Sequence, residues 1–462
     1  MVLPFENLSP DPDNAFFADG LTEELIAELS GLRELRVISR TSAMQFKDTK
    51  KNVPTIAREL NVRYVLEGSV RRAGNSVRIT AQLIDAPTDS HLWAERYTGK
   101  LDDIFDLQEQ LSRRIAEALR VALTPEEHRR LASRPINDVR AYDAWLRARH
   151  EMWKSTKEGF ERGIELVNRA QEITGDNALL HAALGYIHAQ SYNLGIPHDR
   201  ETLQRAEQHA TKALEMDPSL GLALHAGGFV RFKRGDFEGC ARLVRCAVER
   251  DHDIDALSFL GCVLGIAGKL DEARKVADEA LALDPLYPFT GITRAFVDVM
   301  DGQFGAAASR FQNVLDVLSP DNDFTLWWLA QAMAHGGQLE EAKEVFAAVA
   351  TTSAGAIADT SELYCRAAEG DRHAVVRLID EKPSMVETAK TDEWYPNFIA
   401  NCLTMVGDED GALEWLGRAI DWGFCNYRYL GEYNPFLKPL HGNPRFRHLI
   451  DKARQKYDAF DA

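Results

Sequence analysis

The stretch GKLDEARKVADEALALDP, residues 268–285, carries the pattern that decides the fold of most of this chain. A glycine opens the stretch, alanines follow five and twelve residues later, and an Asp-Pro pair ends it. Ala273 and Ala280 lie on the same face of a helix, where their small side chains let a second helix approach closely. Pro285 cannot continue that helix. The stretch therefore predicts the second helix of a tightly packed helical hairpin.

The same pattern recurs along the chain at nearly constant intervals. Glycines at positions 235, 268, 302, 337, 370 and 407 are each followed five residues later by a small or branched residue, and successive glycines are 33, 34, 35, 33 and 37 residues apart. A period near 34 residues is typical of tetratricopeptide (TPR) repeats, in which each hairpin buries its apolar face against the next. With two less regular units between residues 145 and 218, the pattern predicts about eight hairpins.

Before residue 125 the pattern changes to short strands mixed with helices. Apolar runs at residues 2–5, 35–39 and 64–72 predict strands, and the alternation from Val77 to Leu83 predicts a strand with one buried face. The intervening Ala-Gly-Asn-Ser tolerates a positive φ, so the last two strands should form a hairpin. Helices are expected over residues 19–31, 55–60 and 104–119. The fold class is therefore a small α/β domain followed by an all-α TPR superhelix.

An acidic cluster opens the first predicted helix, FADGLTEELIAELS at residues 17–30. Asp19 comes directly before a run of leucines at four-residue spacing, so we expect its carboxylate to cap the helix by accepting backbone N–H bonds. Glu23 and Glu24 then fall near the positive end of the helix dipole. Because no histidine lies before residue 91, the cluster predicts neither a catalytic nor a metal site.

Composition and charge exclude several classes of partner. The chain of 462 residues has a net charge of −17, which argues against direct nucleic-acid binding and against an anionic membrane surface. No apolar run approaches the roughly 18 residues that a membrane helix needs, so membrane insertion is not expected. All six cysteines lie after residue 239 without a CxxC pair, which predicts buried or half-buried free thiols in a reducing compartment.

Four arginines on the predicted hairpin strands form the first candidate site: Arg71, Arg72, Arg78 and Arg96. Arginine forks suit phosphates, so these residues could form a small anion or nucleotide pocket. The alternative is a solvated sheet face whose arginines pair with acidic residues. No GxxxxGK[ST], GxSxG or HExxH motif occurs in the chain. We therefore predict no catalytic residue, no metal site and no cofactor.

The second candidate site is the concave groove of the TPR superhelix. Counting along the first helix of each hairpin places seven residues in the groove: Phe229, Phe296, Trp327, Gln331, Tyr364, Asn397 and Asn401. Aromatic and amide side chains can hold an extended peptide or a partner helix. The alternative for each aromatic residue is packing between adjacent hairpins. Asn397 and Asn401 are more informative because exposed amides one turn apart contribute little to a core.

The first part of the chain also resembles a known family. VLPFENLS, FFADGLTEELIAELS and IARELNVRYVLEGSVRRAGNSVRITAQLIDAPTDSHLWAERY are similar to the TolB-like amino-terminal domain of bacterial multidomain proteins, over residues 2 to 123. The rest resembles the TPR array that follows this domain, and NPFLKPLHGNPRF resembles its end-of-group cap. We therefore expect a TolB-like domain at 1–124, TPR repeats at 125–432 and the cap at 433–462.

The resemblance also implies a setting for the function. In that family the two domains follow a class III adenylate or guanylate cyclase or a winged-helix DNA-binding domain, and the residues typical of either are missing here. We therefore expect a piece of a longer signalling protein.

The predicted function is a non-catalytic regulatory module that binds a protein or peptide partner and is compatible with a homo-oligomer. The alternatives are a regulatory fragment of a cyclase and the sensor half of a transcriptional regulator. If such a chain were named as a cyclase, the name would describe the catalytic domain that precedes these two domains in the family. The expected location is cytoplasmic, or periplasmic if a membrane helix precedes the domain.

Overall fold

The computed structural model describes residues 1–10, 14–152, 154, 156–194, 196, 199–251, 253–318 and 322–461. The chain forms two compact units. The first contains Met1–Val230 and Cys246–Ile254, and the second contains Arg231–Arg245 and Asp255–Ala462. Within the described residues, no helix combines the length and the apolar character that crossing a membrane requires.

A four-stranded mixed sheet forms the start of the first unit, in the order β1-β2-β3-β4. The short β1 runs parallel to β2, whereas β2, β3 and β4 are antiparallel neighbours. Gly74 has φ +58° in the turn between β2 and β3, which confirms the predicted hairpin and its need for a residue that tolerates positive φ. The strands are β1 (Glu6–Asn7), β2 (Tyr64–Ala73), β3 (Ser76–Asp85) and β4 (Ser90–Lys100).

Two of the predicted strands differ in the structure. The run at residues 2–5 makes only a bridge from Val2 to Leu66, and the ladder continues into β1. The strand expected at residues 35–39 is wrong, because none of these residues pairs with the sheet. A strand needs a partner for its backbone groups. Ser39 instead caps α2 (Arg40–Met44) by accepting a hydrogen bond from the Ser42 amide.

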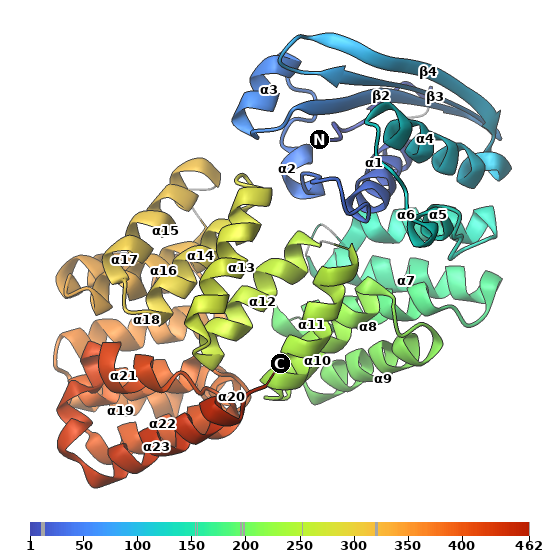
Figure 1. The fold of residues 1–462 in the computed structure, drawn as a ribbon. Coiled ribbons are helices and arrows are strands. Elements are labelled where there is room, and N and C mark those ends of the chain that lie inside the picture. The colour runs from blue at the N-terminus through green and yellow to red at the C-terminus, as the bar shows by residue number, and fades with distance from the viewer. Residues whose placement is uncertain are drawn as a thin grey trace. The chain divides into compact units, whose positions relative to one another are not determined.

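Helices cover one face of this sheet, as Figure 1 shows for α1 (Ala15–Ser30) and α4 (Ile104–Ala118). The alternation of β3 turns Val77 and Ile79 into the core, where both are fully buried. The opposite face carries the exposed or half-buried residues of the three long strands. The α/β class predicted from the sequence is therefore confirmed.

Helical pairs make up the rest of the chain. The described residues contain eight consecutive pairs, from α6/α7 to α21/α22, with the short α5 (Pro125–Leu131) before them and α20 (Pro383–Ala389) inside the series. The hairpin glycines that define the repeat have φ between +73° and +89°, the left-handed conformation that favours glycine. The paired helices are α6 (Val139–Met152), α7 (Lys157–Thr174), α8 (Ala178–Asn193), α9 (Arg200–Met216), α10 (Gly221–Lys233), α11 (Phe237–Asp251), α12 (Ile254–Ala267), α13 (Leu270–Leu283), α14 (Pro288–Met300), α15 (Phe304–Leu318), α16 (Asp323–His335), α17 (Leu339–Thr352), α18 (Gly355–Ala368), α19 (Arg372–Glu381), α21 (Tyr395–Met405) and α22 (Glu409–Trp422).

The chain does not simply end with the last pair. After α22, residues 423–442 run back along the repeats of the second unit, and we call them the returning segment. The final helix α23 (Pro444–Ala459) then packs on α22. The residues predicted as the cap, 433–462, therefore comprise the second half of the returning segment, which contacts earlier repeats, and α23, which packs on the last pair.

The six cysteines carry no disulfide. Cys240, Cys402 and Cys425 are buried, and Cys262 and Cys365 are half-buried, as the sequence predicts. Cys246 is exposed, so the expected burial is wrong at that position. It lies on α11, where it lines the open cavity beside α5 that is described below.

Candidate functional site

The seven groove residues lie on the first helices of their pairs, as counted from the sequence. None is more than 8% exposed. Asn397 and Asn401 are 1% and 0% exposed, so the exposure predicted for these amides is wrong. Asn397 Nδ2 donates to the Glu393 carbonyl one turn earlier at 2.9 Å, and Asn401 Nδ2 donates to the Tyr364 hydroxyl at 3.1 Å.

The structure brings most of the set together in the second unit. Trp327 and Tyr364 both contact the ring of Phe398, and Phe296 packs edge-on against Trp328. Gln331 is fully buried on the same helix as Trp327. Phe229 belongs to the first unit and does not share this cluster. For the aromatic residues the packing alternative therefore describes the structure.

The returning segment covers this surface through polar contacts to backbone and side chains. Asn426 Nδ2 donates to the carbonyls of Gly265 and Met300, at 3.1 Å each, and Asn426 Oδ1 accepts from the Tyr429 amide at 3.0 Å. Asn434 Nδ2 donates to Asn401 Oδ1 at 3.0 Å. These bonds join the ends of α12 and α14 and the middle of α21 to a segment far away in the sequence.

His335 forms the centre of a second contact. Its Nδ1 donates to the Gln331 carbonyl at 2.7 Å, which leaves Nε2 to accept from the Tyr429 hydroxyl at 3.0 Å. Burial lowers the pKa of His335 to about 4, so the ring is neutral at physiological pH. The Phe436 ring meets it edge-on with centroids 4.9 Å apart. A neutral histidine with both nitrogens engaged is a structural hydrogen-bonding group.

The four arginines of the first candidate site do not form one patch. Arg71 and Arg78 are opposite each other in the β2–β3 ladder, and Arg96 lies two positions away on the same outward face. All three are exposed. Arg72 points to the other face, where its Nη1 is 2.5 Å from Asp143 Oδ1 and its guanidinium lies over the Phe17 ring. Three arginines therefore remain as a solvated group.

The acidic cluster of α1 is an ion network. The helix begins at Ala15, so Asp19 lies inside it, 5% exposed, with Lys47 Nζ 2.7 Å away. The prediction that Asp19 caps the helix is therefore wrong. Glu23 pairs with Arg40 of α2 and with Arg149 of α6, at 3.2 Å from the latter. The cluster thus connects α1 to α2 and to the first repeat helix.

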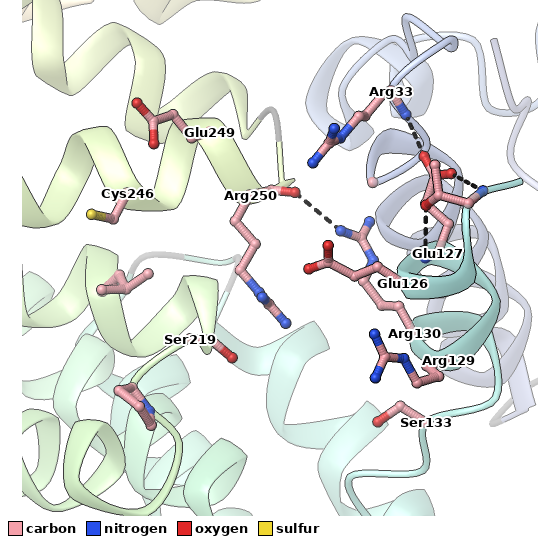
Figure 2. Close-up of a pocket in the computed structure, with 14 residues that line it drawn as sticks. Arg33, Glu126, Glu127, Arg129, Arg130, Ser133, Ser219, Cys246, Glu249 and Arg250 are labelled. Atoms are coloured by element: carbon pink, nitrogen blue, oxygen red, sulfur yellow. Dashed lines mark hydrogen bonds between the residues drawn. The ribbon is translucent and has the colours of Figure 1, made fainter.

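A cavity of about 580 Å³ opens in the first unit beside α5. It is lined by the end of α1, by α5, by the turn before α10 and by the last residues of α11. Figure 2 shows the guanidinium groups of Arg33, Arg130 and Arg250 directed into this space, with Arg129 at its edge. The Glu126 carboxylate reaches into the same space.

Two hydrogen-bonding arrangements hold the cavity wall. Glu127 accepts from the backbone amides of Thr124 and Arg33, at 2.7 and 2.9 Å, and so ties α5 to the end of α1. Arg130 Nη1 donates to the Arg250 carbonyl at 3.0 Å. The arginines around this cavity were not predicted as a site from the sequence. The Thr-Pro-Glu-Glu start of α5 followed by two arginines is the local signal that could have indicated a fixed basic helix.

One family model matches the amino-terminal part of the chain. Residues 1–116 match the family model of the HilA/YgeH-like transcriptional regulator, second domain. The TolB-like assignment of this segment stays a prediction. In the helical part, the period, the paired helices and the positive-φ glycines are those of tetratricopeptide repeats. This part of the chain is a TPR array.

Individual relatives cover only part of the chain. A protein of Rhizobium meliloti named "Putative adenylate cyclase 3" is 45% identical over 186 residues, which are 40% of this chain and 32% of the relative. The transcriptional regulator HilA of Salmonella typhimurium is 20% identical over 241 residues, 52% of this chain and 44% of the regulator. A solved TPR protein of Parabacteroides merdae aligns with a TM-score of 0.41 at 14% identity, over 56% of this chain and 98% of its own. The chain thus spans about a third of the length of the Rhizobium meliloti protein and less than half of the length of HilA.

Proposed function

We propose that this chain is a non-catalytic regulatory module whose TPR array binds a protein or peptide partner. The observation that carries the proposal is that the repeats already hold a segment of the chain itself, which forms a π-helical turn at Tyr429–Tyr433 and a 3-10 helix at Pro435–Gly442. Asn401 and His335 bind Asn434 and Tyr429 of the returning segment through side-chain hydrogen bonds. A helical segment that lies against an apolar, aromatic-lined surface is a recurring mode of peptide recognition.

The relatives support a regulatory role. Parts of the chain are similar to a protein named as an adenylate cyclase, over 186 residues, and to a transcriptional regulator, over 241 residues. A chain that is similar to parts of two proteins with different named activities is best explained as a module that serves either output. The full-length activity then belongs to parts of the relatives that this chain does not span. The six free cysteines support a cytoplasmic location.

More specifically, we propose that a partner binds to the surface that the returning segment covers, and that it displaces this segment. The test is a fluorescently labelled peptide of residues 423–442, added to the full chain and followed by anisotropy. The wild-type chain should bind it weakly, because its own segment competes at an effective concentration in the millimolar range. A chain with Asn426→Ala and Asn434→Ala should bind at least about tenfold more tightly, since these changes remove contacts worth 1.4 kcal/mol or more.

Two controls make the result specific. A peptide with the same two substitutions should not bind, and His335→Ala in the double-variant chain should weaken binding because it removes the acceptor for Tyr429. Circular dichroism confirms that each chain remains helical. A folded double variant that leaves the native peptide unbound would refute the groove as a peptide-binding surface.

The second candidate function is a cyclase fragment or the sensor half of a transcriptional regulator, which the names of the two relatives favour. We expect the purified chain to form no cyclic nucleotide from ATP or GTP and to show no retardation of duplex DNA. Turnover that scales with chain concentration and persists through a second purification step would favour the cyclase fragment instead.

A further inference from the structure

The cavity beside α5 combines a suitable size with an unusual concentration of guanidinium groups. Its volume of about 580 Å³ lies within the range of small-molecule sites. Four arginines line it, in a chain whose net charge is −17. Three of them come from separate elements: Arg33 follows α1, Arg130 belongs to α5 and Arg250 ends α11. The fold, and not a run of basic sequence, brings these charges together.

The arginines are only partly neutralised by the chain itself. Glu127 is engaged with two backbone amides. Among the described residues, Arg33 and Arg250 make no hydrogen bond or ion pair through their guanidinium groups. Glu126 is the carboxylate that reaches into the space between them (Figure 2). With Glu249, the lining holds three glutamates against four arginines, which leaves a formal excess of one positive charge.

Gly31 makes room for one of these arginines. Arg130 Nη2 lies 0.5 Å from the position that a Cβ at residue 31 would take. Gly31 has φ −79°, a conformation that any residue adopts, so its backbone does not require glycine. The missing side chain is what allows the Arg130 guanidinium to pass the end of α1. Any larger residue at this position would displace the arginine from the cavity wall.

From this geometry we propose that the cavity binds a small phosphorylated ligand of the nucleotide class. Guanidinium forks hold phosphate oxygens through paired charge-assisted hydrogen bonds. The Glu126 carboxylate and the hydroxyls of Ser133 and Ser219 line the same cavity and accept hydrogen bonds from ligand hydroxyl or amino groups. The site joins the α/β part to the first repeats within one compact unit. A ligand there bridges α5 and the end of α11.

Isothermal titration calorimetry of the full chain with ATP, and competition by pyrophosphate, test the proposal at low ionic strength. Wild type should bind ATP, and pyrophosphate should displace it because phosphate recognition is the shared chemistry. Arg33→Ala and Arg250→Ala should each weaken binding about tenfold, which corresponds to the loss of one charge-assisted hydrogen bond. Gly31→Ala should weaken it as well, although it removes no charge.

The matched control is a chain with Arg71→Ala and Arg78→Ala, which removes two exposed arginines from the open sheet face. This control should bind ATP within about twofold of wild type, since electrostatics at a distance are screened by solvent. Melting temperatures establish that all variants are folded. No binding by wild type, failure of pyrophosphate to compete, or a loss in the sheet control equal to that in Arg250→Ala would each overturn the proposal.

Discussion

Two repeat glycines with the same backbone conformation separate the effect of the returning segment from that of the turn itself. Gly302 and Gly370 both have φ +73°. A Cβ at Gly302 would lie 2.9 Å from Tyr433 Cγ, whereas a Cβ at Gly370 would have no atom within 4 Å. Substitution by alanine therefore imposes the same backbone strain at both positions and a steric clash at only one.

The expected magnitudes follow from these two terms. An alanine forced to positive φ costs about 1 kcal/mol, so Gly370→Ala should lower the free energy of unfolding by that amount. Overpacking against the half-buried Tyr433 ring adds about 1–3 kcal/mol, so Gly302→Ala should cost about 2–4 kcal/mol in total. Urea unfolding of the full chain, followed by tryptophan fluorescence and by circular dichroism, measures both.

A double-mutant cycle checks the cause. Tyr433→Ala removes the ring, so in its background Gly302→Ala should cost no more than Gly370→Ala does. Equal destabilisation by the two glycine substitutions in the wild-type background, within about 0.5 kcal/mol, would show that Tyr433 does not rest on the repeat turn. The position of the returning segment would then be wrong.

Three further predictions concern buried polar groups. Asn426→Ala removes three hydrogen bonds within the second unit and should cost about 2–4 kcal/mol in urea unfolding; a loss below about 0.5 kcal/mol would contradict the contacts. Asp19→Asn keeps the ability to cap a helix but loses the charge facing Lys47, so it should lower the free energy of unfolding by about 1 kcal/mol, and Asp19→Ala should do the same. If Asp19→Asn left the stability unchanged, the ion-pair interpretation would be wrong. Burial raises the pKa of Glu28 to about 8, above its unfolded value, so the folded chain binds the extra proton and stability should fall as pH rises from about 4 to 8. Glu28→Gln should flatten that part of the pH profile of the melting temperature, and an unchanged slope would contradict the raised pKa.

The repeat architecture and the central hairpin could be predicted because both depend on local patterns. In each TPR hairpin a glycine marks the turn, and the small residue five positions later marks the contact between the two helices. The alternation from Val77 to Leu83 indicates a strand with one buried face, and this prediction does not depend on which helices cover that face. The run at residues 35–39 has strand-like composition but no partner, because strand formation also depends on a free sheet edge in the right place.

The candidate sites were less predictable. Counting along the repeats placed Asn397 and Asn401 on the correct helices, yet both are buried, and Asn401 contacts Asn434 of the returning segment. Alternation of side chains along β2 puts Arg72 on the core side, where Asp143 of α6 pairs with it. Nothing near Arg130 in the sequence indicates that the end of α11 lies beside it.

Periodicity in the amino-acid sequence was thus sufficient for the two fold classes, the hairpin turns and the number of helical pairs, since the geometry of helix and strand imposes those repeats directly. Tertiary structure alone decided that Asp19 is an ion-pair partner, that the groove amides are covered and that four arginines share a cavity. The physical reason is that the environment of a polar side chain depends on segments far away in the chain. Burial against such a segment determines whether the side chain caps a helix, closes a groove or faces a ligand.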